Sequence, residues 1–261
     1  MNPVGTENSI SIIVPTLNEE ENVKPLVGQI ASCAIPFGEI LFVDEHSTDA
    51  TRDKIRMLAA SHPIRLIEQD GSNAGLAAAI MSGARAARGE ILLVMDADLS
   101  HPSDRIKDLV QPVLKGTADM VIGSRYVSGG STPGWPLWRR ILSRAGALLA
   151  YPLTGVHDSM CGFFCIRRAK LLELSPQPSG FKLVFETLMR GGRSLRVCEI
   201  PIVFKDRACG RSKMSFGVAL RFSTRWVLAM FRHIIRAPSA SSNVSRPAAG
   251  NIPLDPERLV E

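Results

Sequence analysis

The sequence predicts an α/β protein with a mostly parallel, Rossmann-like central sheet flanked by helices. Short apolar runs alternate with helical segments through the first half of the chain, at a spacing of about 25 residues that is typical of βαβ units. Two of the apolar runs stop abruptly at acidic residues, as buried parallel strands do when they end at a ligand site. The chain has 261 residues, of which 45% are hydrophobic, so it can build one large domain or two smaller ones.

The strand and helix signals follow one another regularly in the first half. Strands are expected at residues 10–15, 39–43, 64–67, 90–95 and 120–123, and helices at residues 19–34, 49–61, 74–88 and 103–115. The second half is less regular, with helices expected at residues 137–151 and 181–190 and strands at residues 162–166 and 195–204. Pro201 interrupts the last run. Because proline cannot donate a backbone hydrogen bond, it indicates an edge strand or a strand end.

The strongest chemical signal is the pair Asp96 and Asp98, which ends the apolar run of residues 91–95. Two uncompensated carboxylates repel each other, so a divalent cation with oxygen ligands, Mg²⁺ or Mn²⁺, is their natural partner. Such an ion keeps coordination positions open for substrate phosphates. The alternative is that the pair caps the following helix, because residues 100–104 include good N-cap residues. The two residues alone leave both interpretations open.

Net charge and cysteine content indicate the class of partner and the cellular compartment. The formal net charge of +6 favours an anionic partner, which could be a nucleotide, a lipid headgroup or nucleic acid. The five cysteines are scattered without paired metal-ligand spacing, which indicates buried structural residues in a reduced, cytosolic compartment. We see neither a signal peptide nor an apolar run of about 18 residues, so we expect no membrane span.

The C-terminal part carries a separate signal. Residues 216–236 are strongly apolar, but four arginines recur within about 60° of one another on a helical wheel, namely Arg221, Arg225, Arg232 and Arg236. This pattern fits an interfacial helix on an anionic bilayer, a core helix with one solvated face, or a docking helix for a membrane-embedded partner. Residues 237–261 are rich in Pro, Ser, Ala and Asn, which predicts a disordered tail, and residues 1–8 are expected to be flexible.

Six motifs in order resemble those of a known family. They occupy residues 14–22, 43–51, 95–102, 123–126, 158–163 and 199–213. Together they resemble the GT-A glycosyltransferases of family 2, and within that family the polyprenyl-phosphate sugar transferases of the dolichol-phosphate mannosyltransferase type. The resemblance extends over about residues 9 to 235 and implies a GT-A catalytic domain at residues 9–215.

The resemblance also implies a reaction. We first expect an inverting enzyme that transfers a hexose to a polyprenyl or dolichyl phosphate with the help of Mg²⁺ or Mn²⁺. Mannose is the first choice of hexose, and GDP-mannose is the first choice of donor. The alternatives are a family 2 enzyme that uses a UDP-sugar and a different acceptor, or a degenerate subunit that only binds nucleotide sugars. Because a polyprenyl phosphate is already an anion, its attack on the anomeric carbon needs no strong general base.

The resemblance assigns the donor side to residues at the ends of the first, second and fourth strands and to two later cations. The nucleoside would contact Pro15, Leu17, Glu19, Val43, Asp44 and Glu45. Asp96, Ala97 and Asp98 would follow, with Asp98 the surest metal ligand and Asp96 either a second ligand or a ribose contact. Arg207 and Lys213 resemble the family's cationic pair near the diphosphate, where positive charge offsets the charge of the leaving group.

The resemblance assigns the acceptor phosphate to Arg125, Arg139 and Ser143, since arginine supplies planar bidentate donors for phosphate. Arg125 is expected to act on both substrates and counts, with Asp98, Arg207 and Lys213, among the residues expected to be catalytic. The other interpretation of Arg139 is a solvated helix face.

The chain departs from the family pattern at the nucleoside site. The family usually has Asp-Asp-Gly where this chain has Asp44, Glu45 and His46, and an aromatic residue is common where it has Leu17. A glycine at that position often serves an unusual backbone angle, so His46 must tolerate the angle or the loop must change. These differences leave the choice between GDP and UDP open.

The resemblance sets the expected location and partners. The enzyme would lie peripherally at the cytosolic face of a membrane, where it would meet its nucleotide-sugar donor and its lipid acceptor. A small membrane-anchoring subunit is a further possible partner, and no nucleic acid is expected. The helix of residues 216–236 or the loop around Gly129 to Trp138 could provide the approach to the membrane.

Overall fold

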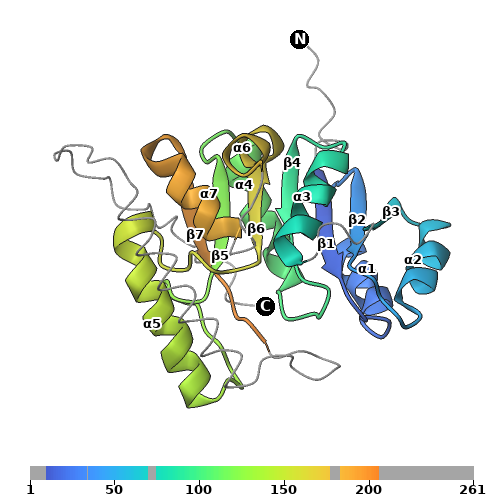
Figure 1. Cartoon of the computed structure of the whole chain (residues 1–261), viewed down its shortest axis with the longest axis horizontal. Helices are drawn as coiled ribbons and strands as arrows, with labels where there is room; N and C mark the ends of the chain where they lie inside the picture. The colour runs from blue at the N-terminus through green and yellow to red at the C-terminus, as the bar shows by residue number, and fades with distance from the viewer. Residues whose placement is uncertain (1–9, 34, 70–74, 177–182, 206–261) are drawn as a thin grey trace, which may run out of the picture.

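The computed structural model describes residues 10–33, 35–69, 75–176 and 183–205. Their core is a seven-stranded sheet in the order β3-β2-β1-β4-β6-β5-β7. The strands are β1 (Ile10–Thr16), β2 (Glu39–Asp44), β3 (Ile64–Glu68), β4 (Ile91–Val94), β5 (Met120–Ser124), β6 (Phe164–Arg167) and β7 (Val197–Pro201). Helices cover both faces of this sheet (Figure 1).

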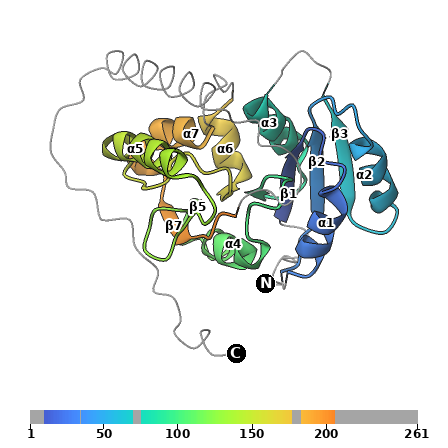
Figure 2. The ribbon, with the colours of Figure 1, turned by 90° about the horizontal axis from the view of Figure 1, so that it is seen from below.

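The helices form two layers around the sheet. They are α1 (Val23–Ala31), α2 (Thr51–Ala59), α3 (Leu76–Ala86), α4 (Ile106–Leu114), α5 (Leu137–Thr154), α6 (Arg168–Leu174) and α7 (Leu183–Gly191), with short 3₁₀ turns η2 (Ser103–Arg105) and η3 (Gly192–Ser194). Seen along the sheet, α1 and α4 lie on one side, and α3, α6 and α7 lie on the other (Figure 2). This arrangement confirms the predicted α/β architecture.

Most strand pairs are parallel, as predicted. The β1–β2, β1–β4, β2–β3 and β5–β7 pairs are parallel, whereas β6 runs antiparallel to both β4 and β5. Sequence reasoning did not identify the direction of β6. Pro201 is the last residue of β7, which lies at the edge of the sheet, so both interpretations of this proline are confirmed.

Several predicted element ends were wrong, and α6 was not expected. The helix predicted to begin at residue 19 begins at Val23 and follows a turn over residues 20–22. The backbone N–H groups of Glu19 and Glu20 donate to the side chains of Thr51 and Asp49. The helix predicted to end at residue 151 continues to Thr154, with Pro152 inside it. The four cysteines in the described ranges are free. Cys161 and Cys165 are buried, as expected, whereas Cys33 and Cys198 are only half-buried.

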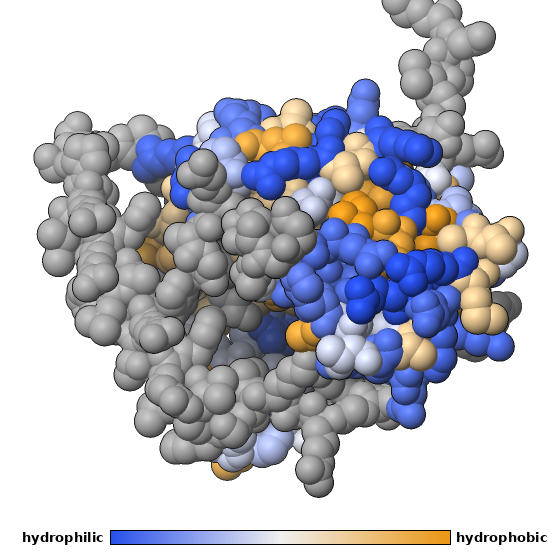
Figure 3. Space-filling model, turned by 45° about the vertical axis from the view of Figure 1, so that its right-hand side comes forward, coloured by the Kyte–Doolittle hydropathy of each residue, from blue (hydrophilic) through white to orange (hydrophobic). Residues whose placement is uncertain are grey.

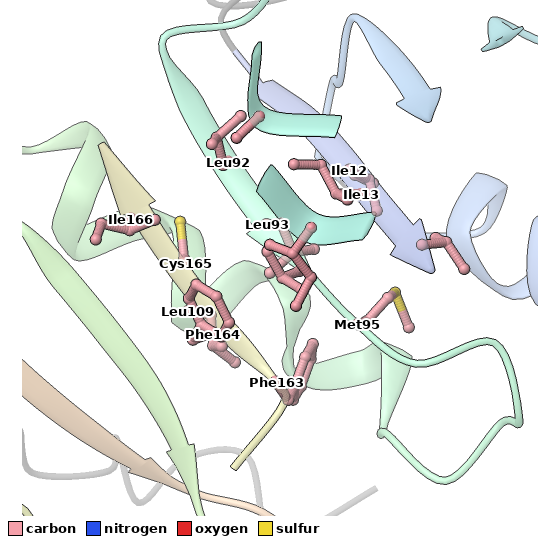
Figure 4. Close-up of a cluster of buried hydrophobic side chains, with 14 of the residues drawn as sticks. Ile12, Ile13, Leu92, Leu93, Met95, Leu109, Phe163, Phe164, Cys165 and Ile166 are labelled. Atoms are coloured by element: carbon pink, nitrogen blue, oxygen red, sulfur yellow. The ribbon is translucent and has the colours of Figure 1, made fainter. Parts of the chain in front are cut away.

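The core extends along the whole sheet, and Figure 4 shows its part around β1, β4 and β6. The strands read as continuous apolar runs because helices cover both faces of the sheet, so that side chains of either orientation are buried. The surface in Figure 3 carries mainly hydrophilic residues, with smaller apolar patches between them. The predicted helix of residues 216–236 and the predicted tail of residues 237–261 lie outside the described residues.

Helix α3 approaches the sheet closely at Gly83, so we expect Gly83→Ala to lower the free energy of unfolding by about 1–3 kcal/mol through overpacking. A Cβ atom there would lie 2.7 Å from Cγ2 of Ile13 and 3.1 Å from Cγ2 of Val43. Gly28→Ala in α1 is the matched control, because a Cβ atom at Gly28 has no heavy atom within 4 Å. We expect the control to gain about 0.5–1 kcal/mol, since alanine favours the helix. Urea denaturation measures both, and equal effects would contradict the packing argument.

Candidate functional site at the carboxyl edge of the sheet

Three neighbouring parallel strands end side by side and form the floor of the candidate site. Asn18 follows β1, His46 follows β2 and Leu99 follows β4, with φ angles of 55°, 66° and 62°. They are the non-glycine residues with positive φ in the described ranges. Because such backbone angles are unfavourable and gather at functional sites, their position marks this edge. The predicted conflict at His46 is thus resolved: the loop keeps a left-handed angle, and His46 tolerates it.

The loops after β1 and β2 are tied together by hydrogen bonds. The Asn18 N–H donates to Ser47 Oγ at 2.9 Å, and the Thr48 N–H donates to Asn18 Oδ1 at 2.8 Å. One turn further, the Ala50 N–H donates to the Glu20 carboxylate at 3.0 Å. These bonds fix the two loops that carry the predicted nucleoside contacts.

The structure brings the predicted nucleoside residues together. Pro15 and Val43 are buried register partners on β1 and β2, and Leu17, Glu19 and Glu45 are half-buried on the loops above them. Asp44 is buried and accepts the Ser47 N–H at 3.0 Å through Oδ2. Its other oxygen, Oδ1, has no hydrogen-bond partner among the described residues. A buried carboxylate oxygen without a donor fits a base N–H or a ribose hydroxyl.

The acid pair, Asp96 and Asp98, follows β4, which is the strand next to β1. Asp98 is 5% exposed, and its Oδ1 accepts both the hydroxyl of Ser100 at 2.6 Å and the Ser100 N–H at 3.1 Å. The side chain of Asp96 is 35% exposed. Neither acid caps a helix, because η2 and α4 both begin without a side-chain cap, after Pro102 and Arg105. The helix-cap interpretation is therefore wrong.

The donor set of this pair fits a hard divalent cation. Carboxylate oxygens suit Mg²⁺ or Mn²⁺, which are commonly held by one or two carboxylates together with water and substrate phosphates. In the part of the chain that the structure describes, no three His, Cys, Asp or Glu side chains are grouped as a metal site. Asp96 and Asp98 therefore fit an ion that completes its coordination with other oxygen ligands.

A buried histidine, His101, lies against the acid pair and was not singled out from the sequence. Its Nδ1 accepts the backbone N–H of Asp96 at 3.0 Å. Its ring stacks on Phe163 at 4.9 Å between centroids and meets Phe204 edge-on at 5.4 Å. Burial lowers its pKa below the usual range, which keeps the ring neutral. From the sequence alone, only its position in the motif at residues 95–102 could be seen.

Arg125, directly after β5, forms a buried ion pair that the sequence did not predict. Its Nε and Nη2 each donate to the Asp158 carboxylate at 2.7 Å, and its backbone N–H donates to the same group at 3.0 Å. Burial opposes the charge, but Asp158 outweighs it and holds the pKa of Arg125 above its usual range. Asp158 is held in turn by Glu199, which accepts the Asp158 N–H at 3.0 Å. These bonds do not use Nη1 of Arg125, which has no hydrogen bond to another described residue.

Of the residues predicted for the acceptor phosphate, Arg125 and Arg139 lie around Trp135, and Ser143 bonds to the neighbouring Tyr126. The guanidinium of Arg139 lies 3.8 Å from the centre of the indole ring, and that of Arg125 lies 5.4 Å from it. Ser143 accepts the hydroxyl of Tyr126 at 2.6 Å. Arg139 is thus packed on an aromatic ring, which argues against its interpretation as part of a solvated helix face. Arg207 and Lys213 lie outside the described residues.

The segment after β7 connects the acid side and the arginine side. The Lys205 N–H donates to the Ser100 carbonyl at 3.2 Å, and the Phe204 N–H donates to the Ser131 carbonyl at 2.9 Å. The Phe204 ring contacts His101 on one side and Trp135 on the other, edge-on to both at 5.4 Å. The two parts of the candidate site therefore share one packed wall.

Comparison with known proteins agrees with this geometry. The model of the family described as glycosyl transferase family 2 matches residues 11–175, which is more than half of the chain. The chain belongs to glycosyl transferase family 2. The match begins inside β1 and ends directly after α6, so it includes the acid pair and the Arg125–Asp158 ion pair.

Two relatives of this family 2 protein are similar over most of its length. A dolichol-phosphate mannosyltransferase of Pyrococcus furiosus is 33% identical over 242 residues, which cover 91% of this chain and 66% of the relative. An undecaprenyl-phosphate mannosyltransferase of Micrococcus luteus is 34% identical over 229 residues, which cover 83% of this chain and 93% of the relative. The resemblance read from the six motifs is thus confirmed.

Solved structures confirm the GT-A fold of this family 2 chain. Glucosyl-3-phosphoglycerate synthase from Mycobacterium tuberculosis, in complex with Mn²⁺, UDP and its product, is 20% identical with a TM-score of 0.65, covering 85% of this chain and 79% of that one. Mannosyltransferase PcManGT from Pyrobaculum calidifontis, in complex with GDP-Man and Mn²⁺, is 20% identical with a TM-score of 0.62, covering 89% and 66%.

We expect Asp158→Asn to lower the free energy of unfolding by about 3–5 kcal/mol, because it leaves the buried charge of Arg125 uncompensated. The matched control is Asp119→Asn. Asp119 binds Arg196 through the same three donors, with the Nε and Nη2 bonds at 3.0 and 2.8 Å, but the Arg196 side chain is 57% exposed against 9% for Arg125. The control should cost no more than about 1 kcal/mol. Urea denaturation measures both, and a cost at Asp158 no larger than that at Asp119 would contradict burial as the cause.

Proposed function

We propose that this family 2 glycosyltransferase moves a mannosyl group from GDP-mannose to a polyprenyl phosphate at a membrane surface. The observation that carries the proposal is that two groups of residues share the packed wall around Phe204. One group is the acid pair with the nucleoside loops beside it, and the other is the two arginines around Trp135. The similarity to polyprenyl-phosphate mannosyltransferases supports the choice of sugar and acceptor.

The donor would lie along the ends of β2, β1 and β4. Its nucleoside would contact Pro15, Val43 and the loops that carry Leu17, Glu19 and Glu45, and the free Oδ1 of Asp44 would accept a donor from the base or ribose. The solved neighbours are described with GDP-Man in one case and UDP in the other, so the base is chosen by the similarity to mannosyltransferases. A UDP-sugar is the alternative donor.

The diphosphate would lie at Asp96, Ala97 and Asp98. A Mg²⁺ or Mn²⁺ ion held there by the two carboxylates would supply positive charge for the diphosphate leaving group. Both solved neighbours are described with Mn²⁺, which supports this assignment. Arg207 and Lys213, which lie outside the described residues, are proposed to add positive charge on the same group.

The acceptor phosphate would be held by Arg125, Arg139 and Ser143. Nη1 of Arg125 and the hydroxyl hydrogen of Ser143 are donors that the contacts of these residues leave for a ligand. A phosphate oxygen would form a bond to the anomeric carbon while the bond from that carbon to the diphosphate oxygen breaks, releasing GDP. The attacking oxygen carries no proton to remove, so no general base is needed, and direct displacement inverts the sugar carbon.

The exposed face of α5 supports a peripheral position on the membrane. Six of the nine exposed large apolar side chains of the described residues lie on α5: Leu137, Trp138, Ile141, Leu148, Leu149 and Tyr151. Arg140 and Arg144 flank them, which is the composition of a helix that lies in an anionic interface. None of the described helices combines the length and apolarity that crossing a bilayer requires. The cytosolic face remains the proposed side, and a membrane-anchoring subunit remains a possible partner.

We expect the protein to release GDP from GDP-mannose only when both polyprenyl phosphate and Mg²⁺ or Mn²⁺ are present. Asp98→Ala should lower turnover more than about 100-fold, since losing the groups that merely support metal ligands already costs 10–100-fold. Asp104→Ala is the matched control, because that carboxylate is 77% exposed on η2. Product NMR should give the anomeric configuration opposite to that of the donor.

Three outcomes would overturn parts of the proposal. Unchanged turnover in Asp98→Ala would remove the metal assignment, and a covalent sugar–enzyme intermediate would remove direct displacement. If polyprenyl phosphate failed to stimulate consumption of any nucleotide sugar, an enzyme that uses a different acceptor or a subunit that only binds nucleotide sugars would replace the proposal.

We expect the double variant Ile141→Glu/Leu148→Glu to bind vesicles with anionic lipid at least about tenfold more weakly. Burying a large apolar side chain contributes about 1.5–3 kcal/mol, and 1.4 kcal/mol corresponds to tenfold in affinity. Met57→Glu is the matched control, because Met57 is 76% exposed on α2, far from α5. Vesicle flotation measures the bound fraction. If the α5 variant bound as well as the control, residues 216–236 would replace α5 as the proposed membrane contact. Reversing the charge of their four arginines would then test that assignment directly.

A further inference from the structure

The inference concerns Tyr126, which directly follows Arg125 after the end of β5. Its hydroxyl donates to Ser143 Oγ at 2.6 Å, although the two residues are 17 positions apart and Ser143 belongs to helix α5. Tyr126 is part of the motif at residues 123–126, in which only Arg125 has a role in the proposed reaction. A short hydrogen bond to a residue proposed to hold the acceptor phosphate gives this tyrosine a possible role of its own.

The direction of this bond decides which proton is left for a ligand. A tyrosine hydroxyl has one proton, and burial raises the pKa of Tyr126 above its usual range, so it keeps that proton at neutral pH. Donation to Ser143 uses one lone pair of Oγ and leaves the serine proton in place. In the described part of the chain that serine proton forms no hydrogen bond.

A serine inside a helix has a competing partner for its proton. Such serines commonly donate to the backbone carbonyl four residues earlier, which for Ser143 is the carbonyl of Arg139. Among the described residues Ser143 makes no bond of this kind, and its Oγ is bound to Tyr126 instead. Without the tyrosine hydroxyl, we expect the serine to turn to that carbonyl, where its proton would be lost to a phosphate.

Packing does not hold Ser143 in place by itself. The buried side chains of α5 are Ala147, Ala150 and Thr154, so the half of the helix that carries Ser143 has none. Tyr126 reaches this half from the sheet, and its ring lies 5.3 Å from the guanidinium of Arg125. The tyrosine thus contacts residues on both sides of the proposed phosphate site.

We propose that Tyr126 is a positioning residue for the acceptor phosphate: its hydroxyl holds Ser143 Oγ, so that the serine proton is directed to a phosphate oxygen. The proposal rests on the proposed function, because it assumes that Ser143 binds the polyprenyl phosphate. The competing role is packing alone, in which the ring of Tyr126 supports Arg125 and its hydroxyl has no effect.

Tyr126→Phe separates these roles, because it keeps the ring and removes only the hydroxyl. We expect the KM for polyprenyl phosphate to rise about 3–10-fold, which corresponds to one lost hydrogen bond, and the KM for GDP-mannose to stay unchanged. Ser175→Ala is the matched control, because it breaks another bond between two hydroxyls, that of Ser175 and Thr187 at 2.9 Å, outside the candidate site. It should change neither KM, and circular dichroism checks the folding of both variants.

A double variant tests whether Tyr126 acts through Ser143. Ser143→Ala removes a hydrogen bond to a charged phosphate, so we expect it to raise the KM for polyprenyl phosphate about 10–100-fold. In that background Tyr126→Phe should change the KM by less than about twofold, since the residue on which it acts is already gone.

The outcomes separate this proposal from the proposed function. A wild-type KM in Tyr126→Phe, or a further 3–10-fold rise when it is added to Ser143→Ala, would overturn the positioning role while mannosyl transfer stands. An unchanged KM in Ser143→Ala would remove Ser143 from the phosphate site and this proposal with it. If polyprenyl phosphate did not stimulate the wild type, the proposed function would fail and this proposal would fail as well.

A measurement on the unaltered protein keeps the proposal testable if Tyr126→Phe does not fold. The chain has two tyrosines, so the ¹³Cζ resonance of Tyr126 can be resolved by NMR. We expect it to move downfield when farnesyl phosphate is added at a concentration that saturates turnover, because a serine that donates to phosphate accepts more strongly from tyrosine. A resonance that does not move, or that moves equally in Ser143→Ala, would overturn the proposal.

Discussion

The structure depends on the pairing of β4, which runs parallel to β1 and antiparallel to β6. Because β1 and β4 are parallel, their carboxyl ends meet, and the nucleoside loops lie beside the acid pair. Because β6 is antiparallel, it begins where β4 ends, and Val94 is the register partner of Phe164. The segment that contains Asp158 therefore arrives at the acid pair. One reversal of strand direction brings both halves of the site to one edge of the sheet.

The same reversal places the buried charges. The β5 end is also beside the start of β6, which puts Arg125 next to Asp158, and β7 runs parallel to β5, which puts Glu199 within reach of the backbone of Asp158. An arginine and two acids are thus held in a buried network next to the acid pair. Arginine suits this place because its planar fork can bind Asp158 through two nitrogens and still present a third.

The sequence predicted the parts of this arrangement that depend on local pattern. Apolar runs located the strands, since buried strands must be apolar, and the acids that end the β4 run located the metal candidate. The direction of β6 was not predictable, because an apolar run has the same pattern in either direction. The partnership of Arg125 with Asp158 was missed for a related reason: the two residues are 33 positions apart, and only the fold brings them together. His101 was missed because its ring contacts with Phe163 and Phe204 join residues far apart in the sequence, and only the fold brings them together.

The left-handed turn at Leu99 explains how one short loop can bond back to both acidic residues. Leu99 has a φ of 62°, and this reversal lets the N–H and hydroxyl of Ser100 fold back onto Asp98 while the next residue passes beneath Asp96. A glycine would adopt the same angle without steric cost, but it would also give the unfolded and open loop many more conformations. A leucine has fewer alternatives than a glycine. The unfavourable angle at Leu99 thus lies between the acid pair and the two residues that bond to it, Ser100 and His101.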